Sequence, residues 1–271
     1  MAVAENVEDA DAPVKIVRGD IPVVLGVPHA GTWVPEPVTA ALNETGRGIT
    51  DTDWHMDRLY DGLLPGASMV CARFHRYVID ANRDPSGASL YPGQNTTGLV
   101  PTTDFDGNPI WDTPPDDAEI AARVAAFHRP YHEALASEIE RVRAQHGIVI
   151  LYDCHSIRSR IPFLFDGTLP DFNIGTNRGE TCAPAIEQLV ERVCASAHGY
   201  TSILNGRFVG GWTTRHYGRP EQGVHAIQME LAQSTYMDEH APWTYRPEKA
   251  DAVRRVLGDL LEGIHQLHAR L

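Results

Sequence analysis

The sequence predicts an α/β protein, organised as one domain over residues 14–271. Apolar runs of strand length alternate with segments of helical periodicity along the whole chain, which is the pattern of an α/β fold. No internal repeat and no Gly/Ser-rich linker divides the chain, and its 271 residues are enough for one large domain with an ample core. Residues 1–13 are acidic, rich in alanine and without periodicity, so we expect a flexible N-terminal tail there.

In the first half of the chain, the clearest strand is 23–27, a continuous run of valine, leucine and glycine that ends before a proline. A helix is expected after Asp53, because apolar residues recur there at spacings of three and four. Further strands are expected near 67–74 and 76–80. The turn-rich segment 84–115 is predicted to cover a site, since loops of that length in a compact domain are usually functional.

The second half of the chain begins with its longest helical pattern, from about residue 116 to 145, with Gly147 as the expected C-cap. A buried strand at 148–153 follows directly. The remaining elements are expected as a helix at 181–197, a strand at 224–231 and an amphipathic helix from 247 onward.

Composition narrows the class of partner and the compartment. The formal net charge of −13 argues against nucleic acid, because phosphate binding needs a basic surface. No apolar run is long enough to span a membrane, and the acidic start does not resemble a signal peptide. The four cysteines show no Cys-x-x-Cys spacing, which favours a reduced, cytoplasmic setting. A small anionic substrate would have to be bound by local arginines against a repulsive overall field.

Polar side chains follow the buried apolar run that precedes Asp153. Because side chains alternate along a strand, Asp153 and His155 point to one face while Cys154 and Ser156 point to the other. This alternation argues against a hydrolytic triad among these four neighbours. An α/β enzyme forms its site at the carboxyl ends of its strands, where both His155 and His29 are expected.

Two histidines at strand ends, a carboxylate at a helix start and a glutamate in a late strand form the residue set of a catalytic zinc site. The candidate ligands are His29, Asp53 and His155, with Glu230 as general base. Other interpretations stay open, since Asp53 is also typical of a helix start and His155 of a buried core histidine. An acidic residue in the apolar strand of Glu230 needs a partner or a function. The competing ligands near the helix start are Asp51, His55 and Asp57.

Another pair of histidines, His128 and His132, has the spacing that zinc metalloproteases use on a helix. No glutamate follows the first histidine, and Pro130 lies between the two. We therefore interpret this pair as structural.

Three arginines are candidates for binding an anion. Arg76 and Arg83 begin and end a segment that we read as a strand running into a turn, and Arg215 lies in the glycine-rich segment 210–218. An arginine at a strand end can bind a carboxylate through two hydrogen bonds or neutralise a developing oxyanion. Solvent-exposed ion pairs with acidic neighbours are the alternative.

Seven short motifs are specific in combination. They are Val27–Gly31 (VPHAG), Asp51–Asp61 (DTDWHMDRLYD), Arg76–Arg83 (RYVIDANR), Ser89–Gln94 (SLYPGQ), Asp153–Ser156 (DCHS), Asn173–Asn177 (NIGTN) and Gly223–Leu231 (GVHAIQMEL). As a set, over about residues 15–260, they resemble the N-formylglutamate deformylase family, the amidohydrolases of histidine degradation. That family is similar in fold to zinc-dependent exopeptidases. The resemblance therefore implies a three-layer α/β fold, with a mixed central sheet, helices on both faces and one zinc ion.

The resemblance also implies a role for each matching residue. His29 would be the first metal histidine, His155 the second, Glu230 the general base, Arg76 the carbonyl-polarising arginine, and Asn82 with Arg83 the pair that binds the substrate α-carboxylate.

One departure from the exopeptidase pattern concerns the third ligand. That pattern has a glutamate three residues after the first histidine, where this chain has Thr32. We expect Asp53 to replace it, with His55 or Asp57 as alternatives. Arg215 is our candidate for the side-chain carboxylate of the substrate.

The activity implied is hydrolysis of N-formyl-L-glutamate to formate and glutamate, without a nucleic acid or membrane partner. Three alternatives stay open. A related enzyme would cleave a different acyl group or amino acid, a different mechanism would use Cys154 as nucleophile, and a binding protein would have no catalysis.

Overall fold

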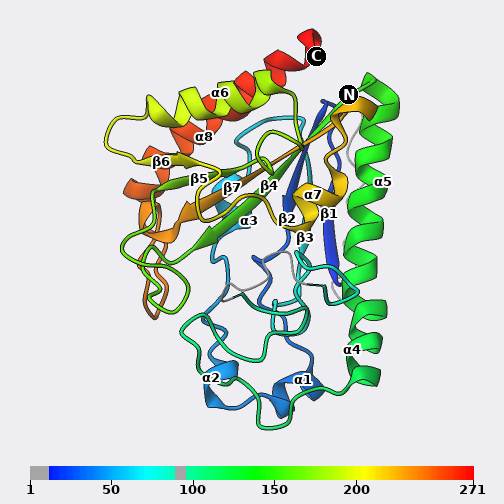
Figure 1. The fold of residues 1–271 in the computed structure, drawn as a ribbon, viewed down its shortest axis with the longest axis vertical. Coiled ribbons are helices and arrows are strands. Elements are labelled where there is room, and N and C mark those ends of the chain that lie inside the picture. Colours follow the sequence, from blue (N-terminus) through cyan, green and yellow to red (C-terminus); the bar gives the residue numbers. More distant parts are fainter. Residues whose placement is uncertain (1–11, 89–95) are drawn as a thin grey trace.

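A seven-stranded mixed sheet forms the centre of the computed structural model, which describes residues 12–88 and 96–271 (Figure 1). The strand order is β1-β3-β2-β4-β7-β5-β6. Strands β3, β2, β4 and β7 are parallel to one another, whereas β1 and β5 are antiparallel to their neighbours β3 and β7. The strands are β1 (Val14–Val17), β2 (Val23–Val27), β3 (Ser68–Ala72), β4 (Val149–Ile157), β5 (Phe172–Gly175), β6 (Ser202–Leu204) and β7 (Val224–Ala232).

Helices cover both faces of this sheet (Figure 1). Helix α5 (Arg129–His146) packs on one face, and α6 (Pro184–Ala195) packs beside α8 (Pro247–Leu267) on the other. The shorter helices are α1 (Glu36–Ala41), α2 (Glu44–Arg47), α3 (Met56–Tyr60), α4 (Asp117–Arg123) and α7 (Trp212–Tyr217), with a π-helical turn η1 (Val124–His128) and 3-10 turns η2 (Pro220–Gln222), η3 (Gln233–Thr235) and η4 (His268–Arg270). The predicted three-layer fold with a mixed sheet is confirmed.

The two apolar layers follow from the periodicity of the helices. In α8, Val253, Leu257, Leu260 and Ile264 recur at spacings of three and four, and all are fully buried against the sheet. Helix α5 presents a similar stripe of buried residues to the opposite face. Burying each such side chain contributes roughly 1.5–3 kcal/mol, so the two layers supply much of the stability of the fold.

Several element boundaries differ from expectation. The strand predicted at 76–80 is absent, because the chain turns there, with the Val78 N–H donating to the His75 carbonyl oxygen. Its apolar residues are buried all the same, which explains the strand-like pattern. Strand β4 continues four residues past its expected end at Asp153.

The predicted helices were closer to the structure. The long helical pattern at 116–145 is confirmed, although a π-helical turn interrupts it before α5. The helix after Asp53 ends early, at Tyr60, and the one predicted from 181 begins at Pro184.

Part of the sequence-based interpretation falls outside the described residues. This applies to the motif Ser89–Gln94 and to nearly all of the tail expected at 1–13. The extent of one domain over 14–271 stays a prediction. Within the described ranges, no helix is both long and apolar enough to span a bilayer.

Candidate metal centre and active-site cavity

The register of two central strands brings His155 beside Glu230. Strands β4 and β7 are parallel, and the Cα atoms of His155 and Glu230 are direct partners. Asp153 is the partner of Gln228 two residues earlier, so all four side chains share one face of the sheet. Both strands are near their carboxyl ends here, which is where a parallel sheet places its site.

Main-chain hydrogen bonds bring His29 and Asp53 to the same place. His29 follows the end of β2, the other neighbour of β4. Its carbonyl oxygen accepts from the Asp53 N–H at 3.1 Å, and the Asp53 Oδ2 accepts from the Ser156 N–H at 2.9 Å. Asp53 therefore lies between the loop after β2 and the end of β4, ahead of helix α3.

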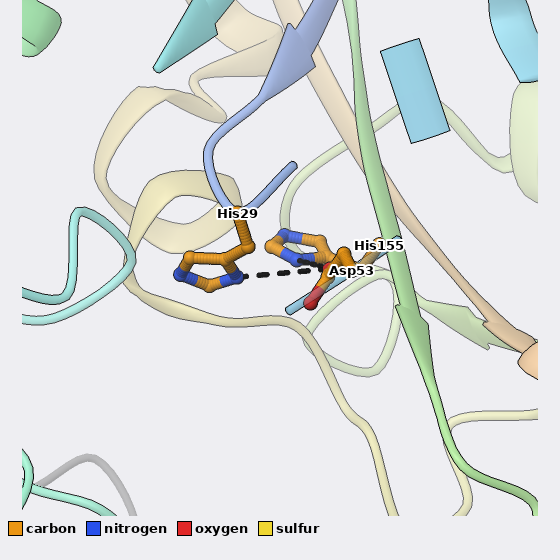
Figure 2. A group of neighbouring side chains, drawn as sticks. All are labelled: His29, Asp53 and His155. Carbon is orange, nitrogen blue, oxygen red and sulfur yellow. Dashed lines mark ion pairs between the residues drawn. The ribbon is translucent and has the colours of Figure 1, made fainter. Parts of the chain in front are cut away.

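The three predicted ligands converge on one point, as Figure 2 shows. One ligand atom from each of His29, Asp53 and His155 lies within 4.8 Å of the others, and none of the three residues is more than 3% exposed. The Asp53 Oδ2 is 3.8 Å from Nδ1 of His29 and 3.5 Å from Nδ1 of His155. This spacing is that of groups arranged around a shared central position.

The second nitrogen of each histidine has a carboxylate partner. The Nε2 of His29 is 2.7 Å from the Asp80 Oδ1, and the Nε2 of His155 is 3.1 Å from the Asp153 Oδ2. Carboxylate partners of this kind hold the proton on Nε2 and leave the Nδ1 lone pair for a metal. The buried Nδ1 of His29 has no hydrogen-bond partner among the described residues, so the two histidines and Asp53 fit a metal ion.

Asp53 is held in its ionised form. Burial by itself raises the pKa of this carboxyl, but the positive charge of Arg76 and the two adjacent histidine side chains hold the pKa well below its usual range. The guanidinium of Arg76 donates from Nη2 to the Asp53 Oδ1 and is itself buried. An ionised carboxylate is the form that ligates a metal.

Glu230 has the opposite electrostatic character. Burial raises the pKa of its carboxyl to about 8, and the positive charge of His155 opposes this only in part. The Gln228 Nε2 donates to the Glu230 Oε2 at 3.2 Å, which orients the carboxyl. A carboxyl whose pKa lies near neutrality is suited to accept and return a proton.

These groups open into a cavity of about 640 Å³, measured with the solvent at its mouth. Among the described residues, its charged lining consists of Glu230 and three arginines, Arg76, Arg83 and Arg207. Apolar lining comes from Phe105, Ile157, Leu164 and Phe208. A wall with several cations and few anions is suited to an anionic ligand.

A family model described as N-formylglutamate amidohydrolase matches residues 21–237 of this chain. The chain belongs to this family. It is 49% identical over 257 residues to an N-formylglutamate deformylase of Pseudomonas aeruginosa, covering 94% of this chain and 96% of that protein. A deformylase of the same name from Pseudomonas putida is 46% identical over 250 residues, covering 91% and 93%. The resemblance inferred from the seven motifs is confirmed.

Solved structures agree in fold. A crystal structure of N-formylglutamate amidohydrolase from Ralstonia eutropha JMP134 is similar with a TM-score of 0.80 and 29% identity, over 96% of this chain and 99% of that one. A gene product of Agrobacterium tumefaciens is similar with a TM-score of 0.69 and 19% identity, over 97% and 99%, and supports the fold alone.

In this member of the N-formylglutamate amidohydrolase family, Asn82 and Arg83 also lie at the cavity. The Asn82 Oδ1 accepts from the Thr213 N–H at 2.9 Å, and its Nδ2 is 3.2 Å from the His155 Nε2. Arg83 donates from Nε and Nη2 to the carbonyl oxygen and the hydroxyl of Thr97, each at 2.9 Å. Both side chains are therefore held in place in the cavity wall, with Asn82 beside His155.

The alternative ligands lie elsewhere. The Nε2 of His55 is 2.7 Å from the carbonyl oxygen of Trp243, and Asp57 is exposed. Asp51 accepts at Oδ2 from the Tyr77 hydroxyl and the Phe105 N–H, and burial raises its pKa to about 7. None of the three joins the described cluster of metal-binding groups.

Cys154 lies on the other face of β4, in the apolar layer beneath α6 and α8. It is fully buried, and burial raises the pKa of its thiol well above the usual range. The described lining of the cavity does not include it. These observations disfavour Cys154 as a nucleophile.

The second histidine pair, His128 and His132, contacts the main chain next to Asn82. The Nε2 of His128 is 2.9 Å from the carbonyl oxygen of Arg83, and the Nε2 of His132 is 2.7 Å from that of Ala81. The pair therefore holds the main chain on either side of Asn82, which agrees with a structural role.

Three polar residues of the site, Asp80, Gln228 and Arg207, are not among the candidates predicted from the sequence. Asp80 lies in the motif Arg76–Arg83. Its pairing with His29 depends on the turn at residues 75–78, where the sequence predicts a strand. Gln228 shares a strand face with Glu230, which was a usable signal. Arg207 stands between Gly206 and a glycine pair at 210–211, whereas the predicted Arg215 is absent from the described cavity lining.

Proposed function

We propose that this chain hydrolyses N-formyl-L-glutamate to formate and L-glutamate, with a metal ion held by His29, Asp53 and His155. The observation that carries the proposal is the buried convergence of these three groups beside Glu230 in an arginine-lined cavity. The names of the relatives, N-formylglutamate deformylase and amidohydrolase, support the choice of substrate.

Zinc is the metal that we propose, because two histidines and one carboxylate form a ligand set typical of catalytic zinc. When bound, it would supply a Lewis acid toward the formyl oxygen and lower the pKa of a water molecule in the site. The protein side of this arrangement is the pair of carboxylates, Asp80 and Asp153, that orient the two histidines.

Glu230 is the group that moves the proton. Its carboxylate takes a proton from the attacking water while the water oxygen forms a bond to the formyl carbon. The same carboxyl then delivers that proton to the amide nitrogen as the C–N bond breaks, which releases formate and the free amine of glutamate. The buried position and raised pKa of Glu230 support this role.

Arg76 and the Asn82–Arg83 pair are proposed to hold the rest of the substrate. Arg76 lines the cavity next to the metal ligands, where its charge would stabilise the oxyanion that develops on the formyl oxygen. Asn82 and Arg83 would hold the α-carboxylate, since hydrogen bonds fix both side chains in the cavity wall, Asn82 beside His155 and Arg83 against Thr97.

Metal analysis and formate release together test this proposal. Protein purified without added metal should contain about one zinc ion per chain, release formate from N-formyl-L-glutamate, lose that activity with a chelator and regain it with zinc. The Glu230→Gln variant should keep the metal and lose about 10³-fold in kcat, because the proton carrier is gone. A matched Cys154→Ala variant should stay active. A metal-free preparation with full activity would refute the proposed mechanism.

The cellular setting belongs to the same proposal. We place the reaction in histidine degradation, as the resemblance implies, and in the cytoplasm. All four cysteines are free and buried in the structure, which is compatible with a reducing compartment.

A further inference from the structure

The cavity lining assigns a residue to the second carboxylate of the substrate. We propose that Arg207, carried by the loop of residues 205–211 between β6 and α7, binds the side-chain carboxylate and thereby sets the preference for an acidic amino acid. This inference rests on the proposed hydrolysis of N-formyl-L-glutamate and names the residue that recognises its γ-carboxylate.

Glycines allow the loop of residues 205–211 to pack closely under the site. Gly210 has φ of 114°, a conformation that favours glycine. A Cβ atom on Gly211 would lie 2.3 Å from the Asn82 Nδ2, and one on Gly175 would lie 2.5 Å from the Gly210 nitrogen. The loop is therefore in direct contact with Asn82 and with β5.

Hydrogen bonds connect the end of this loop to β7 and to the segment after β5. The Asn177 N–H donates to the Val209 carbonyl oxygen at 2.6 Å. The Gly211 N–H donates to the Gln228 Oε1 at 2.6 Å, and the other end of the same amide donates to Glu230. The loop is thus positioned relative to the proposed proton carrier through a single side chain.

Arg207 is fixed in the cavity wall on the loop. Its Nε donates to the Leu164 carbonyl oxygen at 3.3 Å. The adjacent Phe208 packs against the small apolar cluster that contains Phe105 and Ile157, and both Arg207 and Phe208 line the cavity. A carboxylate bound by this guanidinium would leave the methylene groups of a glutamate side chain against an apolar surface.

The other arginines have different positions. Arg76 is paired with Asp53 inside the metal centre. Arg83 comes from the segment that also supplies Asn82, which leaves Arg207 as the described lining arginine from a separate segment. Arg215 donates from Nε to the Gly210 carbonyl oxygen at 2.8 Å, so it supports the backbone of the loop rather than lining the cavity.

The charge of the substrate explains why its second carboxylate needs an arginine of its own. N-formyl-L-glutamate is a dianion, and the chain carries a formal net charge of −13. The substrate therefore enters against overall repulsion, and each buried carboxylate needs its own charged partner. A guanidinium binds a carboxylate through two parallel hydrogen bonds and distinguishes it from a neutral amide of the same shape.

Three substrates separate recognition of the two carboxylates. N-formyl-L-glutamate has both, N-formyl-L-glutamine has only the α-carboxylate, and N-formyl-L-isoglutamine has only the γ-carboxylate. The Arg207→Gln variant should lose about 10²-fold in kcat/KM on the two substrates with a γ-carboxylate and change little on N-formyl-L-glutamine. Arg207→Lys should restore part of the loss, because it returns the charge without the planar geometry.

Arg215→Gln is the matched control, and any loss in that variant should be equal on all three substrates. Equal loss on all three substrates with Arg207→Gln would overturn the assignment, as would a loss confined to the substrates with an α-carboxylate. If the unaltered protein releases no formate from N-formyl-L-glutamate, the proposed function itself fails, which is a different result from a failure of the Arg207 assignment.

Discussion

Two pairs of histidines in this protein have different partners: His29 and His155 line the cavity, whereas His128 and His132 contact the main chain on either side of Asn82. His29 and His155 direct Nε2 to the carboxylates of Asp80 and Asp153, and their Nδ1 atoms face Asp53. His132, in the second pair, directs Nε2 to a backbone carbonyl oxygen, and its Nδ1 is 3.1 Å from the Tyr217 hydroxyl. The partner of the Nε2 atom is thus what distinguishes the two candidate metal ligands from the pair that we interpret as structural.

The same partners set opposite electrostatic properties. Burial by itself lowers the pKa of both His155 and His132, but at His155 the charge of Asp153 outweighs it and raises the pKa well above its usual range. Among the described residues, no carboxylate offsets burial at His132, so its pKa falls to about 3, with the nearby His128 contributing. Spacing in the sequence alone does not reveal this difference, because His-x-x-x-His satisfies a common metal pattern, whereas the candidate pair comes from the loop after β2 and from β4.

The largest effect is expected from removing one of the candidate metal ligands. His155→Gln should abolish metal binding and reduce kcat/KM on N-formyl-L-glutamate at least about 10³-fold, since one ligand of three is removed. The matched variant His132→Gln should keep one metal ion per chain. Metal analysis of both purified variants, with a formate assay, tests the contrast. Metal retained by His155→Gln or lost by His132→Gln would contradict it.

An intermediate effect is expected from the carboxylate partners. Asp80→Asn should weaken metal binding about 10- to 100-fold, because the amide no longer holds the His29 proton as a carboxylate does. Competition with a chelator of known affinity measures this change. Asp117→Asn, at the exposed first turn of α4, is the control and should bind metal as the unaltered protein does. Equal affinities for all three proteins would show that the Asp80 contact has no influence on the metal.

The smallest expected effect concerns pH and the structural pair. The pKa of His132 is about 3 in the folded protein and near 6.5 when unfolded, so the unfolded chain binds an extra proton between these values. The contribution of neutral His132 to the free energy of unfolding is therefore fully present above pH 6.5 and is lost as the pH falls toward 3. From pH 7 to pH 4.5, unaltered protein should lose about 2 kcal/mol more than His132→Gln. Urea unfolding of both metal-free proteins at these two pH values provides the measurement, and parallel losses would contradict the assignment.

The sequence predicted the central layers and the convergence of His29, Asp53 and His155. Those predictions succeeded because buried strands have continuous apolar runs, and because alternation places His155 on a defined face. The choice of Asp53 depended on the family resemblance and on recognising that Thr32 is not a ligand. Its role as a ligand stays a prediction, although the structure places it between the two histidines.

The pairing of Asp80 with His29 and the position of Arg207 required three-dimensional information, whereas strand alternation already placed Asp153 on the face of His155. Asp80 reaches His29 because the chain turns at residues 75–78, where a buried apolar run gave a strand-like pattern. Arg207 and Arg215 both lie beside glycines, and local pattern does not distinguish which side chain lines a cavity. The difference depends on packing of Phe208 and on the contact with Leu164, which are far apart in sequence.

The register between β4 and β7 also limits how this protein can evolve. His155 and Glu230 alternate along their strands with Cys154 and Met229, which are fully buried in the apolar layer on the other face. Inserting one residue into β4 before Asp153 would move the metal ligand into that apolar layer and a core residue into the cavity. Such a change would be eliminated as a folding defect before any loss of activity was exposed to selection. Variation in length among functional descendants is therefore expected in loops away from the cavity, while the lengths of these two strands stay constant.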